Sequence, residues 1–311
     1  MVFREVLMIR FVVTMLSLAL TALAAAALWQ HRRYLHARRV YVQDRQSVFH
    51  SDAVFHVVVF IELRADGDVF DGVRRLRTAA ESGGAAEVVY AGKVAANARS
   101  SSQLLEEFGE QAQWDAIVVV QFESREAWER FAETDGWLRL RDTFKRVYVH
   151  GMKRAALQNL IVPQFFLIRR LQQLLTRAPA QYPFEPMPHA ETEMPEDSPL
   201  AGLDRNRELG RDAIVIVNLT LPGTPDEQAA DRDYVGRMMG LMAEVGNGPM
   251  HIGRAVNLEG EAEFDGVAIV YYPGVDYFKS MATSRFFQGI IDGKQLGDTQ
   301  ATITVPILDV L

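Results

Sequence analysis

The side chains best suited to acid–base chemistry at neutral pH are histidines, and their spacing argues against a metal site. The 311-residue chain has seven, at positions 31, 36, 50, 56, 150, 189 and 251. No plausible domain helix carries the H-E-x-x-H or H-x-x-x-H spacing that turns two imidazoles towards one zinc ion. The chain has no cysteine, which excludes disulfides and thiolate chemistry. We therefore expect no metal and no cofactor.

Other catalytic and binding motifs are also missing. The sequence has no G-x-x-x-x-G-K-[ST] loop, no G-x-G-x-x-G after a strand and no G-x-S-x-G elbow. Nucleotide chemistry and serine hydrolysis thus lack their usual residues. The formal net charge of −7 argues against a nucleic-acid partner.

The remaining candidates are polar residues on expected strands that could point into an interior. A histidine in an apolar pocket can act as a general base, and a tyrosine beside it can donate a hydrogen bond. The alternative is that such histidines are hydrogen-bonded core residues and that the tyrosines only pack. The catalytic candidates are His251, His150, Tyr90 and Tyr271. The ligand-binding candidates are Glu62, Asn97, Gln121, Asn218 and Asn257.

The elements that would position these residues occur twice. Residues 114–142 align with residues 264–292 at an offset of 150 without a gap, and apolar and polar classes largely agree. Trp114 falls on Phe264, and Trp137 falls on Phe287. A match at a fixed period predicts two copies of one domain, which we place at 52–155 and 212–311.

Each copy reads as β-α-β-β-α-β. In the first, β-branched runs predict strands at 56–63, 87–96, 115–122 and within 147–157, with helices at 70–81 and 124–144. The second predicts strands at 213–221, 250–258, 266–272 and 301–308, with helices at 226–245 and 276–291. Such a unit is an antiparallel sheet with helices on one face. Because its other face is apolar, we expect the two copies to pair sheet to sheet as a barrel.

The stretch Ser124-Arg125-Glu126-Ala127, followed by Phe131 and Gly136-Trp137-Leu138, resembles the third strand and helix of the dimeric α/β-barrel (ferredoxin-like) superfamily. The closest resemblance is to the domain-of-unknown-function family 1330, and it covers about 100 residues per copy. It implies an α+β fold in which two ferredoxin-like repeats form an intrachain barrel. The second copy departs from the pattern, with Gly274-Val275-Asp276-Tyr277 in place of Ser-Arg-Glu-Ala. The superfamily includes monooxygenases, isomerases and peroxidases, so the resemblance selects no chemistry.

The N-terminus predicts a single membrane span. After a short tail (1–10), residues 11–29 contain no charge and are long enough to cross a hydrocarbon core. We expect a retained anchor; a cleaved signal peptide is the alternative. Trp29 would lie at the interface, and the basic stalk 30–51 begins with Arg32 and Arg33. Because arginines are more numerous after the span, we expect the N-terminus outside and the domains in the cytoplasm of a bacterial-type cell membrane.

Two segments separate the copies. Residues 156–176 are apolar, and an amphipathic helix on the membrane surface competes with a connector packed on the domains. Its candidate lipid contacts are Phe165, Phe166, Arg169 and Arg170, and Pro163 predicts a helix break or start. Residues 177–211 are acidic and proline-rich, which predicts an extended linker.

Three functions follow from these patterns. The first is a membrane-anchored, non-enzymatic module that binds a small apolar ligand or a partner protein. The second is a cofactor-independent monooxygenase-like or isomerase-like enzyme acting on a lipophilic substrate. The third is a structural subunit of a membrane complex. Membrane lipid is an expected partner in all three.

Overall fold

The computed structural model describes residues 2–39, 53–84, 86–187, 199–294 and 297–311. The strands are β1 (Phe55–Glu62), β2 (Ala86–Arg99), β3 (Ala116–Phe122), β4 (Arg146–Arg154), β5 (Ile214–Leu221), β6 (Gly248–Asn257), β7 (Gly266–Tyr272) and β8 (Asp298–Pro306). The helices are α1 (Val2–Arg39), α2 (Val69–Glu81), α3 (Ser102–Phe108), α4 (Arg125–Ala132), α5 (Asp135–Arg141), α6 (Gln158–Thr176), α7 (Pro199–Arg205), α8 (Pro225–Val245), α9 (Gly274–Ala282) and α10 (Arg285–Gln288). Two short 3₁₀ turns are η1 (Ile291–Gly293) and η2 (Leu308–Val310).

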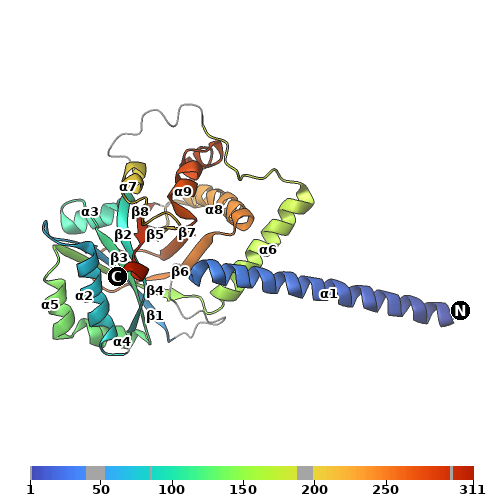
Figure 1. The fold of residues 1–311 in the computed structure, drawn as a ribbon, viewed down its shortest axis with the longest axis horizontal. Helices are drawn as coiled ribbons and strands as arrows, with labels where there is room; N and C mark the ends of the chain where they lie inside the picture. Colours follow the sequence, from blue (N-terminus) through green and yellow to red (C-terminus); the bar gives the residue numbers. More distant parts are fainter. Residues whose placement is uncertain (1, 40–52, 85, 188–198, 295–296) are drawn as a thin grey trace.

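The fold is α+β and is built on a closed antiparallel barrel. The strand order is β1-β3-β2-β8-β5-β7-β6-β4, with β4 pairing again with β1. The first four strands are therefore ordered β4-β1-β3-β2 and the last four β8-β5-β7-β6. The two groups join at β2–β8 and β4–β6, so neither group keeps an open edge. Figure 1 shows the barrel at the centre with helices around it.

Alternation along each strand separates three cores. Val58, Phe60, Val217 and Leu219 point inwards and form one buried cluster to which both strand groups contribute. Their neighbours Val57 and Val59 point outwards under α2, α4 and α5. A third cluster lies outside the second strand group and includes residues of α8 and α9. The apolar sheet faces of the two groups thus cover each other, as the patterns predicted.

The connecting segments differ from expectation in two places. Pro163 lies inside α6, which runs from Gln158 to Thr176, so the predicted break or start at this proline is wrong. The predicted extended linker contains α7. Leu203 of α7 is fully buried, and Gly202 packs so tightly on β2 that a Cβ there would overlap the carbonyl oxygen of Ala95. A segment as short as α7 is too short for its residues to show helical periodicity.

The N-terminal helix is longer than the predicted span. α1 continues to Arg39, beyond the charge-free stretch, and therefore includes the start of the predicted stalk. Residues 40–51 of that stalk lie outside the described residues. Of the helices that the structure describes, one segment, Arg10–Tyr34, is long and apolar enough to cross a membrane.

Candidate functional site

Two histidines meet at one end of the barrel. The ring centroids of His56 on β1 and His251 on β6 lie 5.2 Å apart, and both side chains are buried. His56 stands opposite Met152 of β4, and His251 stands opposite the inward-pointing Ile269. The barrel therefore holds an imidazole pair inside its wall. Imidazoles are the side chains best suited to acid–base chemistry near neutral pH.

A buried arginine lies at the same end. Arg154 is two residues beyond Met152 on β4 and is 5% exposed. Its Nε donates to Gln158 Oε1 at 3.2 Å, and its Nη2 donates to Asn159 Oδ1 at 3.2 Å. Both amides belong to the first turn of α6. This helix start therefore closes the barrel end over a cationic, hydrogen-bonding group.

The sequence patterns identified His251 but not the rest of this cluster. His56 alternates with Glu62 along β1 at even positions, so the rule that selected Glu62 would also have selected His56. Arg154 lies where the expected fourth strand was placed only loosely, within 147–157. Gln158 and Asn159 carry no signal of their own, since their role depends on where α6 begins.

His150 and Tyr90 lie in the barrel interior as predicted. The Tyr148 hydroxyl and His150 Nδ1 are 3.2 Å apart, and His150 also meets the ring of Phe264 edge-on. Burial lowers the pKa of His150 from 6.5 to about 4. The Tyr90 hydroxyl is 2.6 Å from Thr304 Oγ1, and burial raises the pKa of this tyrosine. Both residues are fully buried, so at neutral pH they form a neutral, closed part of the core.

Glu62 belongs to an ion-pair network at the other end of β1 from His56. Its carboxylate accepts from Lys145 Nζ at 2.6 Å and from Arg146 Nη1 at 2.8 Å. Arg146 Nη2 also donates to Glu110 at 2.8 Å. These two cations lower the pKa of Glu110. Glu62 is 3% exposed, so the network compensates for burying its charge.

The other predicted ligand contacts are scattered. Asn218 points outwards between Val217 and Leu219, and its Nδ2 donates to Ala268 O, so its interior placement was wrong. Asn257 is exposed and donates to Gly260 O, which also contradicts an interior role. The three other predicted residues are partly buried. Asn97 accepts a hydrogen bond from Thr302, and Gln121 lies opposite His56 in the pairing of β1 with β3. Tyr271 packs against the interior cluster.

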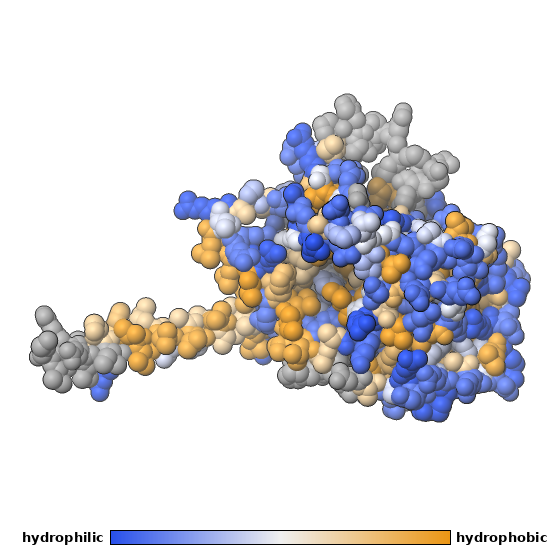
Figure 2. Space-filling view, turned by 180° about the vertical axis from the view of Figure 1, so that it is seen from behind, coloured by the Kyte–Doolittle hydropathy of each residue, from blue (hydrophilic) through white to orange (hydrophobic). Residues whose placement is uncertain are grey.

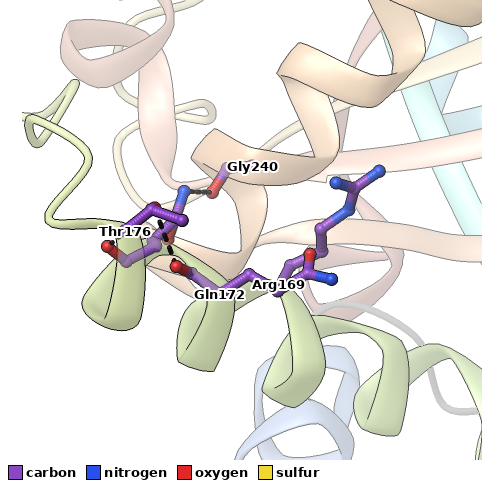
Figure 3. A pocket seen from close by; sticks show the side chains of 5 residues that line it. Arg169, Gln172, Thr176 and Gly240 are labelled. Carbon is purple, nitrogen blue, oxygen red and sulfur yellow. Dashed lines mark hydrogen bonds between the residues drawn. The ribbon is translucent and has the colours of Figure 1, made fainter.

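A hollow of about 400 Å³ lies outside the barrel, between α6 and α8. Gln173 crosses it, and its Nε2 donates to Gly240 O at 3.0 Å. Figure 3 shows the side chains of Arg169, Gln172 and Thr176 on the side of α6 that faces α8. The lining of this hollow combines one guanidinium with amide and hydroxyl groups, and such groups can bind an anion.

The end of α1 is built into the second half of the barrel. Tyr34 is 6% exposed, its hydroxyl donates to Pro249 O at 3.1 Å, and its ring meets Phe166 of α6. Arg33 Nη2 donates at 2.6 Å to Val245 O, one of the last carbonyls of α8, where a cation is favoured. Gly246, at φ +91°, leaves space for this guanidinium.

These contacts correct two predicted lipid contacts. Phe166 is 1% exposed and belongs to the protein core, and Arg33 binds α8. Trp29 and Arg32 remain exposed, as do the apolar residues before them. Figure 2 shows hydrophobic surface along α1 and on the adjoining part of the body.

Comparison with known proteins yields structural likeness without sequence relatives. No family model and no curated protein matches the chain. An anthrone oxidase-like protein matches with a TM-score of 0.43 at 8% identity, covering 83% of this chain and 92% of that one. A chlorite dismutase variant from Candidatus Nitrospira defluvii also matches with a TM-score of 0.43, at 10% identity, covering 86% of this chain and 98% of that one. At these values the function must be argued from the residues of this chain.

Proposed function

We propose that this protein is a membrane-anchored barrel module that binds a small apolar ligand or a partner protein at the bilayer and is not an enzyme. The observation that carries the proposal is the joint between α1 and the barrel. Tyr34 and Arg33 are partners of Pro249 and Val245, more than 200 residues away. A signal peptide is removed and so cannot contribute to the core of the mature protein. The end of α1, in contrast, is part of the core outside the second half of the barrel.

The charge distribution supports an orientation. Arg4 and Arg10 precede the apolar stretch, and five arginines follow it between positions 32 and 45. The side with more positive charge stays in the cytoplasm. We therefore propose that the N-terminus lies outside and that the barrel is cytoplasmic.

The two halves of the barrel support a duplicated domain that completes one fold within one chain. A binding role is favoured over catalysis because the interior side chains pack on one another. His150, which a base mechanism would use, is buried and has a pKa of about 4. A general base at neutral pH needs a pKa near 7 and contact with substrate.

Anchoring is tested on the full chain expressed in bacteria. Intact-mass measurement should find residues 1–39 retained, and alkaline carbonate washing should leave the protein in the membrane pellet. A shortened, soluble product would contradict the proposal. Ligand binding is tested separately: solvent extraction of the natively purified protein, followed by mass spectrometry, would identify a bound lipid or quinone.

One observation favours the second candidate, a cofactor-independent enzyme acting on a lipophilic substrate. The His56–His251 pair and Arg154 bring proton-transfer groups and a cation to one barrel end. If this end holds a lipophilic molecule, a His56→Phe variant should lose the co-purified compound. The matched control is His150→Phe, which changes a histidine in the same barrel away from the pair. Equal retention in both variants would exclude the barrel end as the site.

A further inference from the structure

One face of α6 is apolar and exposed to solvent. Ile161, Ile168 and Leu175 follow one another at helical spacing and are 55%, 53% and 84% exposed. The opposite face carries Phe166 and Asn159, which are 1% and 0% exposed. The helix is therefore packed on the barrel by one face only.

The exposed face adjoins α1. Gln164 Nε2 donates to Ala27 O at 3.4 Å, near the end of the apolar stretch of α1. Figure 1 shows that α6 starts beside the C-terminal end of α1, where α1 meets the barrel, and extends on the side of the barrel from which α1 projects. If α1 crosses a bilayer, this contact holds the first half of α6 beside the end of the membrane-crossing stretch.

Arg169 borders this face, whereas Arg170, four residues after Phe166, lies on the opposite face. Arg169 lies with its guanidinium over the Phe165 ring at 5.3 Å and lines the hollow between α6 and α8. Arg170 donates to Gln173. Among the residues that the structure describes, neither arginine has a carboxylate within ion-pair distance. An apolar face bordered by a cation without an ion-pair partner matches the layers of an anionic membrane surface.

We propose that α6 lies in the interface of the membrane that α1 crosses. Its exposed apolar face contacts the acyl chains, and Arg169 in the hollow binds anionic lipid headgroups. The inference rests on the proposed anchoring by α1. This face contacts a bilayer, and not another protein, because it is continuous with the exposed apolar side chains of α1. Two contact elements would fix the tilt of the barrel, which one helix leaves free.

Single-cysteine labelling tests the placement, since the chain has no cysteine. The full chain is placed in lipid nanodiscs with an environment-sensitive fluorophore at Ile168→Cys or Leu175→Cys. Lipids with a quenching group near the headgroup report proximity. The matched control is Leu138→Cys on α5, whose side chain is 46% exposed in the other half of the barrel. Leu16→Cys in α1 reports the anchor.

We expect at least threefold stronger quenching at Ile168 and Leu175 than at Leu138. Equal quenching at these three positions, with strong quenching at Leu16 by acyl-chain probes, would overturn the inference and keep the anchor. Absent quenching at Leu16 would overturn the proposed function itself. Cross-linking of Ile168→Cys between chains, without quenching, would assign the face to a second copy and also overturn the inference.

The headgroup contact is tested with Arg169→Gln. Lipid exchange in nanodiscs measures the preference for phosphatidylglycerol over phosphatidylcholine in the shell around the protein. Removing one interfacial cation should weaken this preference about fivefold. Arg139→Gln on α5, whose side chain is 77% exposed, is the control. Inorganic phosphate at equal ionic strength should leave the preference unchanged; competition by phosphate, or an unchanged preference in Arg169→Gln, would overturn the headgroup contact.

Discussion

The two halves of the barrel share their strand framework but not their outer layer. In the first half the Asp115 amide donates to Ile61 O, and the Asp115 carbonyl accepts from Val94 N. In the second half Asp265 makes the same two bonds, with Thr220 and Ala255. Asp115 and Asp265 are 150 positions apart, so the offset read from the sequence is also the spatial equivalence in this part of the barrel.

The outer layers are completed in different ways. Trp128, Phe131 and Trp137 of α4 and α5 pack on one another with centroid separations of 5.3–5.9 Å. Most of this layer comes from the first half itself, and Ile307 and Leu308 join it from the end of the chain. The core outside the second half includes Tyr34 of α1, Phe166 of α6 and Leu203 of α7. Those segments lie outside the two groups of four strands and the helices that connect them. The second half therefore depends on these segments for its outer layer, and α1 joins the barrel at that layer.

The largest difference in stability between the halves is expected at an aromatic position that occurs in both. Trp137→Ala should lower the free energy of unfolding by about 3–5 kcal/mol because it empties a fully packed site. Phe287→Ala, 150 positions later, should cost roughly half as much, since Phe287 is only partly buried. Urea unfolding of both variants in detergent measures the difference. Equal losses would mean that the second half packs as independently as the first.

The barrel interior offers a test at one position where the halves differ. His150 pairs across the sheet with Val58, and Thr302 occupies the equivalent place opposite Val217. Because burial lowers the pKa of His150 to about 4, the unfolded chain binds a proton below pH 6.5 before the folded one does. Stability should therefore be full above pH 6.5 and fall by about 3 kcal/mol as the pH drops to 4.

The variant His150→Thr places in the first half the residue type that the second half has at the equivalent position, Thr302. Unfolding measured between pH 7 and pH 4 should be markedly less pH-dependent in this variant than in the parent. A slope that is the same in both proteins would place the titrating group elsewhere.

The strand framework was predictable because its signals are local. The run HVVVFIEL predicted a strand at 56–63, and β1 spans Phe55–Glu62. The second aligned block likewise predicted β7 and its helices. What the patterns could not supply depends on long-range packing. Leu203 is buried only because α7 lies on β2, and Phe166 lost its predicted lipid contact because the end of α1 packs over it.

The site was predicted less well than the fold. Asn218 lies between Val217 and Leu219, which fill the interior side of β5, so strand alternation turns Asn218 outwards and its predicted interior position is wrong. His56 was overlooked although its alternation with Glu62 was visible. The pairing of His56 with His251 could not be read from either strand, since it requires the register of β4 between β1 and β6.

The joint between α1 and the second half should respond to loss of one hydroxyl. Tyr34→Phe removes the donor to Pro249 O and leaves that buried carbonyl without it, which should cost about 1–2 kcal/mol. Hydrogen exchange should quicken at the end of α8 and in β6 but not in the first half. Tyr182→Phe, at an exposed tyrosine near the same half, is the control. Uniform quickening across both halves would indicate that the joint supports the whole barrel.

The smallest expected effect is the one on which the halves should agree. Thr134 Oγ1 accepts from Trp137 N at 3.2 Å and begins α5, and Ser284 Oγ accepts from Phe287 N at 3.1 Å and begins α10. Each cap lies 150 positions from the other, so Thr134→Ala and Ser284→Ala should each cost about 1 kcal/mol. Urea midpoints of the two variants should match within error. A much larger loss at Ser284, which is fully buried and also donates to Met281 O, would show that the second half uses this cap as a core contact. The shared framework would then end at the barrel wall, and the helices outside it would have diverged down to single hydrogen bonds.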